Sequence, residues 1–131
     1  MKRLRGPFIT VCVAGAVALT ACGNGVPKQS GTGGASSAGT AGAKLGTAAV
    51  KIDATDQLQF SPTAGTATVG QIVQWNNTGS VLHNVTFDSE SSLSDSALAP
   101  GGAWQVKFSK AGTYSFKCTI HPGMDGKLTV S

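Results

Sequence analysis

Short runs of alternating apolar and polar residues fill the chain from Ala48 to Ser131, and they constrain its fold more than any other feature. Such alternation predicts strands with one buried face, because successive side chains of a strand point to opposite sides. The clearest apolar pairs are Val50 and Ile52, Val73 and Trp75, Val85 and Phe87, Val106 and Phe108, Tyr114 and Phe116, and Leu128 and Val130. Turn-forming residues separate these runs at Ser61-Pro62, Asn77-Thr78-Gly79, Pro100-Gly101-Gly102 and Ala111-Gly112.

No stretch of this region has the period expected of a stable amphipathic helix. The nearest candidate is Ser89 to Leu98, whose serines favour a loop. About seven or eight short strands without helical crossovers predict an all-β fold, a Greek-key β-sandwich of two sheets. A domain of this size lies near the lower limit for an unaided hydrophobic core, so a bound metal ion would add useful stability.

Four residues carry the soft donor atoms of this region. After Cys22 the chain has one cysteine, two histidines and one methionine, namely Cys118, His83, His121 and Met124. A thiolate, two imidazoles and a thioether match the copper site in which two His and one Cys form a trigonal set and Met is a weak axial ligand. The sequence therefore predicts a site for one copper ion.

The spacing of these residues favours a shared ion over separate roles. Cys118 follows a predicted strand whose inward face carries Tyr114 and Phe116, and the chain must then turn sharply, which brings His121 and Met124 around the same point. Taken alone, Cys118 is explained as an inert buried thiol, His83 as a hydrogen-bonded strand-end residue and Met124 as core packing. Together, these explanations require every soft donor of the region to cluster by chance.

The region from Ala48 to Ser131 resembles the small blue copper proteins, the plastocyanin/azurin-like cupredoxins. The short loop with the spacing Cys-x₂-His-x₂-Met is most similar to that of amicyanin. The segments that carry the resemblance are Val73-Gln74-Trp75-Asn76-Asn77, His83-Asn84-Val85, the Pro100-Gly101 turn before Trp104-Gln105-Val106-Lys107-Phe108, Ala111-Gly112-Thr113-Tyr114, and Cys118-Thr119-Ile120-His121-Pro122-Gly123-Met124.

This resemblance implies a role for each of five residues. His83, Cys118 and His121 would be the strong equatorial ligands of one type 1 copper ion, and Met124 its axial ligand. Asn84 would link the two ligand loops and donate a backbone hydrogen bond toward the thiolate, or else be an ordinary surface residue. In the family, the histidine of the ligand loop, here His121, reaches the surface through an apolar patch, so redox partner proteins would dock near it. The implied function is single-electron transfer, and not enzymatic catalysis.

Residues 1–21 resemble the signal peptide of a bacterial lipoprotein. Positive residues precede an apolar run that is too short to span a bilayer. The run ends at Leu19-Thr20-Ala21-Cys22, which resembles a lipobox, so we expect Cys22 to be the first mature residue and to carry a lipid. The alternative is an ordinary secretory signal cleaved near Ala21. Either signal places the domain outside the cytoplasm, and the lipid would hold it on the extracytoplasmic face of the cell membrane.

Residues 22–47 are rich in Gly, Ala, Ser and Thr and offer few apolar groups to bury. Such a composition predicts a flexible tether between the lipidated Cys22 and the copper domain, which we expect to span residues 48–131 and to be monomeric.

The charge of the chain argues against nucleic acid as a partner. The formal net charge is +4, but after residue 21 seven lysines remain against six acidic residues, and arginine is absent. A nearly neutral chain without arginine lacks the residues that dominate phosphate and base contacts.

Other uses of the same residues can be compared with electron transfer. A copper carrier or buffer would use the same ligands and exchange the metal, and the sequence leaves this alternative open. A cysteine hydrolase with Cys118 as nucleophile and His121 as base would leave His83 and Met124 idle. Zinc would leave Met124 unused. A two-copper centre needs a second loop cysteine, and a multicopper oxidase needs many more histidines.

Overall fold

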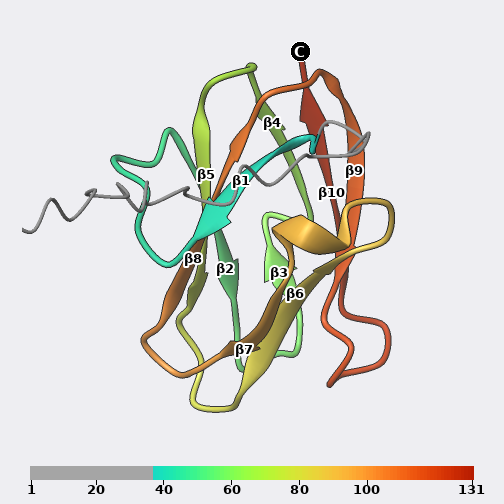
Figure 1. The fold of residues 1–131 in the computed structure, drawn as a ribbon. Coiled ribbons are helices and arrows are strands. Elements are labelled where there is room, and N and C mark those ends of the chain that lie inside the picture. The colour runs from blue at the N-terminus through green and yellow to red at the C-terminus, as the bar shows by residue number, and fades with distance from the viewer. Residues whose placement is uncertain (1–36) are drawn as a thin grey trace, which may run out of the picture. The chain divides into compact units, whose positions relative to one another are not determined.

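The computed structural model describes residues 37–131 of the chain. The predicted signal peptide over residues 1–21, the predicted lipidation site Cys22 and residues 22–36 of the predicted tether lie outside the described residues. The described part is a sandwich of two five-stranded sheets, which confirms the predicted all-β class (Figure 1). It contains ten strands, slightly more than predicted, because several of them are very short.

The first sheet joins strands that are not all consecutive in the sequence. β2 runs parallel to β5, and the other pairs in this sheet are antiparallel. In spatial order its strands are β1 (Gly39–Gly42), β8 (Ala103–Phe108), β5 (Ile72–Asn77), β2 (Val50–Ala54) and β3 (Phe60–Ser61).

The second sheet holds the strands that flank the predicted ligands. β4 runs parallel to β10, and the remaining pairs are antiparallel. In spatial order its strands are β4 (Ala64–Ala67), β10 (Asp125–Val130), β9 (Gly112–Lys117), β6 (His83–Phe87) and β7 (Asp95–Leu98). One turn of 3-10 helix, η1 (Ser91–Leu93), precedes β7.

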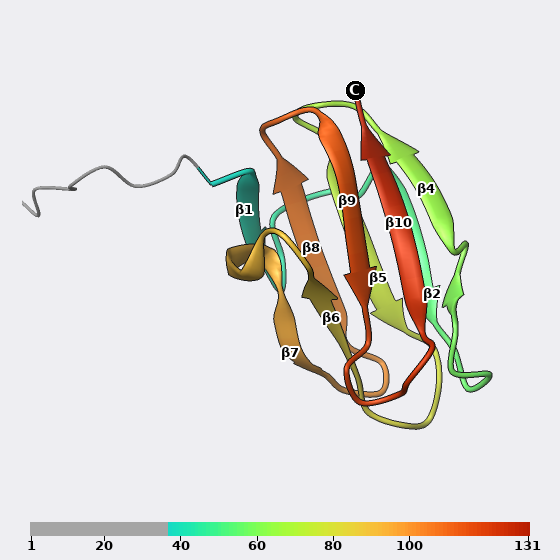
Figure 2. The same ribbon diagram turned by 90° about the vertical axis from the view of Figure 1, so that its right-hand side faces the viewer.

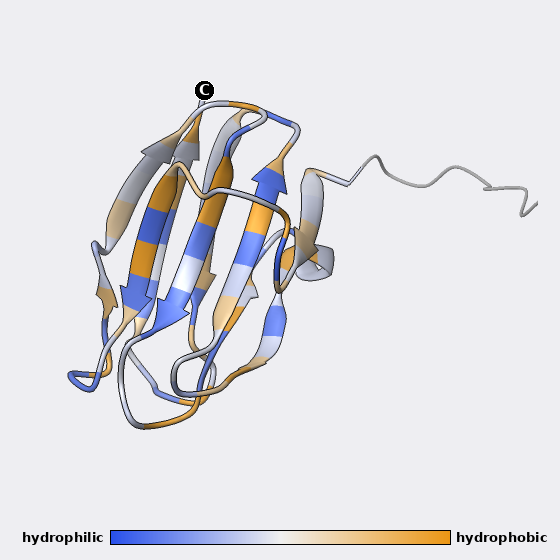
Figure 3. Cartoon of the chain, turned by 90° about the vertical axis from the view of Figure 1, so that its left-hand side faces the viewer, coloured by the Kyte–Doolittle hydropathy of each residue, from blue (hydrophilic) through white to orange (hydrophobic). Residues whose placement is uncertain are grey.

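The core lies between the two sheets and is built from the alternating residues that the sequence predicted. Figure 3 shows this alternation as bands of opposite hydropathy along the strands. Trp75 of β5 is fully buried and packs edge to face against Phe87 and Phe116 of the opposite sheet, with ring centroids 5.5 and 5.2 Å apart. Such contacts between aromatic rings add to the stabilisation from burial alone. They fix β9, and hence the residue that follows it, against the first sheet.

The folded domain begins before the predicted boundary at Ala48. Ala38 is buried, and β1 is an edge strand that pairs with β8 in the register Gly39 with Phe108 and Gly42 with Gln105. The prediction of a flexible tether through residue 47 therefore differs from the structure over residues 38–47. Residues 43–49 then cross from β1 to β2, held by the side chain of Gln105.

The region from Ser89 to Leu98 also differs from its prediction as a loop. It contains η1 and then β7, which pairs with β6 through His83 with Leu98 and Val85 with Asp95. The pairing is irregular, because the register shifts between His83 and Val85. The short β7 thus covers the edge of the second sheet beside the predicted ligand His83.

The sandwich has two distinct ends. We call one the ligand end; it is formed by residues 55–59, 78–82, 99–102 and 118–124, the connections that follow β2, β5, β7 and β9. The start of β1 and the C-terminus lie at the opposite end (Figure 2), because Gly39 pairs with Phe108, the last residue of β8, and β10 ends beside Ala67.

Candidate metal centre

Cys118 lies where the alternation along β9 predicts it. Tyr114 and Phe116 of β9 are buried in the core, and Cys118, the second residue after Phe116, is buried on the same side with 3% of its surface exposed. It is the only free cysteine among residues 37–131. Its thiol therefore faces the space between the sheets at the ligand end.

The chain after Cys118 forms a closed loop. The backbone amide of Cys118 donates to the carbonyl of Met124 at 2.9 Å, and the amide of Met124 donates to the carbonyl of His121 at 3.2 Å. Gly123 has a φ of +83°, a conformation that glycine adopts without steric cost. Met124 itself is buried, with 1% of its surface exposed. These contacts return the loop on itself, so that His121 and Met124 both lie near Cys118.

His83 lies near Cys118 and belongs to β6, the strand that pairs with β9. It is the first residue of β6, is completely buried, and pairs in register with Leu98 of β7. The position confirms the prediction that His83 lies at a strand end beside the ligand loop.

The thiol and both imidazoles converge. Nδ1 of His121 lies 3.5 Å from Sγ of Cys118, and Nδ1 of His83 lies 3.9 Å from the same sulfur. The ligand atoms of the three residues all lie within 4.8 Å of one another. Donors that bind one first-row metal ion at about 2.0–2.3 Å must be spaced in this way. The three side chains therefore fit a single metal ion, with the buried Met124 at the end of the same loop.

The surroundings of His83 favour the neutral imidazole that binds a metal. Burial lowers the pKa of His83, and the neighbouring imidazole of His121 lowers it further. The backbone carbonyl of Thr55 and the carboxyl of Asp56 act in the opposite direction and more weakly. Nε2 of His83 is buried and makes no hydrogen bond of ordinary geometry. Because a metal-bound histidine must be deprotonated at the ligating nitrogen, a lowered pKa reduces the competition from protons.

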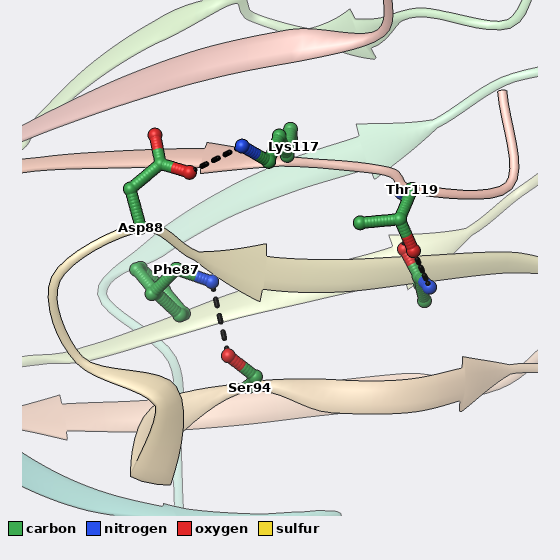
Figure 4. A network of polar contacts seen from close by, with 6 residues as sticks. Phe87, Asp88, Ser94, Lys117 and Thr119 are labelled. Atoms are coloured by element: carbon green, nitrogen blue, oxygen red, sulfur yellow. Dashed lines mark hydrogen bonds and ion pairs between the residues drawn. The ribbon is translucent and has the colours of Figure 1, made fainter. Parts of the chain in front are cut away.

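Asn84 joins the two segments that carry the ligands. Its side-chain amide donates to Oγ1 of Thr119 at 2.7 Å, and its carbonyl oxygen accepts a hydrogen bond from the backbone amide of Thr119 at 2.8 Å (Figure 4 shows the contact at Thr119). Asn84 is buried, with 7% of its surface exposed, so it is not a free surface residue. Thr119 stands inside the loop from Cys118 to Met124, but nothing in the sequence marks it as the partner of Asn84. The backbone hydrogen bond from Asn84 toward the thiolate stays a prediction.

Four large apolar side chains are exposed in the connections of the ligand end. His121 is only partly buried, and its neighbour Ile120 is 41% exposed. Leu82, beside His83, is 45% exposed, and Val81 and Leu58 from the adjacent connections are 40% and 42% exposed. We call these four exposed residues the apolar rim. All four lie in connections of the ligand end, the end at which His121 is partly exposed.

Residues 37–131 contain no helix that combines the length and the apolar character needed to cross a membrane.

Comparison with known proteins agrees with the site. Residues 46–131 match the model of the family described as copper binding proteins, plastocyanin/azurin family. Plastocyanin of Scenedesmus fuscus is 35% identical over 85 residues, which cover 56% of this chain and 87% of the plastocyanin. Amicyanin-alpha of Methylorubrum extorquens is 40% identical over 65 residues, which cover 47% of this chain and 55% of that protein.

Solved structures show the same likeness in three dimensions. The structure of an oxidized mutant of amicyanin superposes with a TM-score of 0.60 at 28% identity, covering 70% of this chain and 92% of that chain. Fold, donor set and sequence thus agree. The chain belongs to the plastocyanin/azurin family of copper-binding proteins, and copper is its cofactor.

Proposed function

We propose that the protein is a mononuclear type 1 copper protein that carries single electrons between redox partners, and that it is not an enzyme. His83, Cys118 and His121 would be the equatorial ligands, and Met124 the axial ligand. The convergence of Sγ of Cys118 with the Nδ1 atoms of His121 and His83, at 3.5 and 3.9 Å, carries this proposal. A bound copper ion supplies one-electron chemistry by cycling between Cu(II) and Cu(I).

The residues around the site favour fast exchange of electrons. Soft sulfur donors suit Cu(I) and imidazoles suit Cu(II), so a mixed set that stays in place serves both states. The Asn84–Thr119 hydrogen bonds and the two backbone hydrogen bonds of the 118–124 loop hold the donors in position. Little rearrangement is then needed when the charge of the ion changes.

His121 would be the exit point for the electron. It is the partly exposed histidine of the site, and the apolar rim lies at the same end of the sandwich. An apolar surface of small area suits brief encounters with a redox partner, because transient electron-transfer interfaces are small. We therefore place the docking site for redox proteins at the ligand end.

We propose further that a lipid on Cys22 tethers the protein to the extracytoplasmic face of the membrane. The support is the lipobox-like segment Leu19-Thr20-Ala21-Cys22 and the positive and apolar residues before it. A lipid anchor of two or more chains gives stable membrane attachment.

A copper carrier that exchanges its metal is the second candidate. The partial exposure of His121 favours it, since a ligand at the surface gives another protein access to the ion. The two functions differ in how long copper is retained: a carrier would give up copper quickly to a competing chelator, and an electron carrier would keep it over many redox cycles.

Visible and EPR spectra of the copper-loaded protein test the proposed function. Thiolate-to-copper charge transfer should give an intense blue colour, and the Cys118→Ala variant should lack it. A colourless copper adduct of the unaltered protein would refute the type 1 assignment. Rapid loss of copper to a chelator in both oxidation states would support the carrier instead.

A further inference from the structure

A second buried asparagine at the ligand end has no hydrogen bond to the donors and yet holds the loop that leads to one of them. Asn77, the last residue of β5, has 2% of its surface exposed. In the sequence it begins the predicted turn Asn77-Thr78-Gly79 and ends the segment from Val73 that carries the family resemblance, with no role of its own. The structure gives it a larger set of hydrogen bonds than a turn requires.

The side chain of Asn77 uses both ends of its amide. Nδ2 donates to the carbonyl of Val81 at 2.7 Å and to the carbonyl of Leu98 at 2.8 Å. Oδ1 accepts a hydrogen bond from the backbone amide of Gly79 at 2.9 Å. Two of these partners lie in the 78–82 loop, and the third is the last residue of β7. A buried polar group with all its partners in place is a rigid link.

The backbone of Asn77 adds a connection to a third segment. Its amide donates to the carbonyl of Gly102, and its carbonyl accepts from the amide of Gly101, each at 2.9 Å. One residue therefore ties the end of β5 to the 78–82 loop, to β7 and to the turn before β8.

These contacts converge on His83. The 78–82 loop runs directly into His83, and Leu98 is the residue of β7 that pairs with His83. The β6–β7 ladder alone holds His83 weakly, because its register shifts immediately after this pair. Asn77 thus holds the loop that precedes His83 in the chain and the residue of β7 that pairs with His83. These links matter because the β6–β7 pairing at His83 is irregular.

We propose that Asn77 is a positioning residue for the copper site: it keeps the imidazole of His83 in the place where it meets the sulfur of Cys118. The inference rests on the proposed function and deepens it. Without the amide, the carbonyls of Val81 and Leu98 and the amide of Gly79 lose a partner. The Leu98 carbonyl is the buried one of the three, and the loss favours movement of the loop toward water. His83 would follow the loop, since it is the next residue of the chain.

A contact from another segment acts on the same loop but cannot replace Asn77. Oδ1 of Asp56 accepts hydrogen bonds from the backbone amide and the hydroxyl of Ser80 at 2.6 and 2.9 Å. Asp56 and Ser80 are exposed, so water competes for these bonds. The side chain of Asn77 is buried, so water competes less for its hydrogen bonds to the 78–82 loop.

The experiment compares Asn77→Ala and Asn77→Ser with a matched control, Asn76→Ala. Asn76 precedes Asn77 on β5, and its side-chain amide is also hydrogen bonded, donating to Oδ1 of Asp53 at 2.9 Å and accepting from Nε2 of Gln74. These bonds lie on the outer face of the sheet, away from His83. The serine variant keeps a hydroxyl for the Gly79 amide and guards against a failure of the alanine variant to fold.

Three measurements on the copper-loaded full chain decide the matter: the EPR and visible spectrum, the reduction potential, and the rate of copper removal by a chelator. We expect both Asn77 variants to lose copper about tenfold faster or more than the unaltered protein, the typical effect of removing an outer contact of a metal site. We also expect a shifted spectrum and potential. The Asn76→Ala variant should match the unaltered protein in all three.

Two results would overturn the inference. One is that the folded Asn77 variants keep the spectrum, potential and copper-release rate of the unaltered protein. The other is that Asn76→Ala changes them equally, which would show a general effect of weakening β5. Failure of the proposed function is a separate observation, since then the unaltered protein itself would show no blue copper spectrum.

Discussion

At the scale of single residues, the site separates donors from the residues that hold them. Cys118, His83 and His121 supply converging atoms. Asn84 and Asn77 supply none, and each connects segments that lie far apart in the sequence. The donors decide which ion binds, and the connecting residues decide how little the donors move when its charge changes.

Replacing Met124 by Gln tests the axial position. An amide oxygen is a harder donor than a thioether and favours Cu(II), so we expect the Met124→Gln protein to keep copper and to have a lower reduction potential. A redox titration followed by the blue colour measures the change. If the potential stayed where it was, Met124 would be a core residue and not a ligand.

Replacing Asp56 by Asn tests the exposed contact to the 78–82 loop. Hydrogen bonds from the backbone amide and then the hydroxyl of Ser80 lower the pKa of Asp56 from its ordinary value of 3.8. A carboxyl with a lowered pKa stabilises the fold above its unfolded pKa, and this contribution is lost as the pH falls through the folded value.

We therefore expect the copper-free Asp56→Asn protein to unfold more easily than the unaltered one at neutral pH. The difference should shrink as the pH falls below about 4 and then vanish. Denaturant titrations between neutral and acidic pH measure it. A difference that stayed constant across this range would mean that the charge of Asp56 does not support the loop.

The four donors could be predicted from the sequence because their residue types are rare in the chain, and because the affinity of these side chains for copper follows from the residue type alone. The sequence also predicted that Cys118 and His83 lie at strand ends, since alternation places Tyr114, Phe116 and Cys118 on one face. Asn77 and Thr119 could not be assigned in this way. Their roles depend on hydrogen bonds to residues 21 and 35 positions distant, which no local pattern records.

At the scale of elements, β1 is the strand that alternation could not predict. Its residues, Gly39–Gly42, carry almost no apolar side chain, so their sequence indicates a linker. The strand exists because β8 offers unpaired backbone groups at the edge of the sheet. A Cβ on Gly39 would lie 2.4 Å from the carbonyl oxygen of Lys107, so the close approach of the two strands there requires glycine.

The segment between β1 and β2 depends on Gln105. Its Oε1 accepts hydrogen bonds from the amides of Leu45 and Gly46, and its Nε2 donates to the carbonyl of Gly46 at 2.8 Å and to Oε1 of Gln74 at 2.6 Å. Gln105 is buried, with 4% of its surface exposed. Its side chain thus supplies hydrogen bonds to a segment that lies between two strands.

We expect Gln105→Ala to lower the free energy of unfolding by about 1–3 kcal/mol, because several backbone groups lose a buried partner. Amide hydrogen exchange should rise over residues 39–49, while the copper spectrum stays unchanged. Lys107→Ala, an exposed position on the same strand, is the control. Equal exchange in both variants would mean that Gln105 does not hold this segment.

β7 was missed for a related reason. Asp95-Ser96-Ala97-Leu98 contains one large apolar residue, and its serine-rich surroundings favour a loop. Its strand conformation comes from pairing with β6, and the hydroxyl of Ser94 accepts a hydrogen bond from the backbone amide of Phe87 at 3.0 Å (Figure 4). When a strand is stabilised mainly by pairing with its neighbour, its own residues need not show the preferences typical of strands.

At the scale of the whole molecule, the predicted lipid anchor and the copper site should be independent of each other. We expect the Cys22→Ala protein to leave the membrane fraction and to keep an unchanged blue spectrum, because Cys22 precedes residues 46–131, which match the copper-binding family and contain all four proposed ligands. Fractionation of cells followed by spectroscopy of the soluble protein measures both properties. A protein that stayed with the membrane would show that something other than a lipid on Cys22 holds it there.

The direction of β1 determines at which end of the sandwich the upstream part of the chain enters the domain. Ser109 donates its backbone amide to the carbonyl of Ala38 at 2.8 Å, so the chain joins the sandwich at the end away from the donors. The stretch from Cys22 to Ser37 spans at most about 55 Å. An attachment that enters the domain at this end leaves the loop of residues 118–124 and the apolar rim at the far end of the sandwich, open to collision partners.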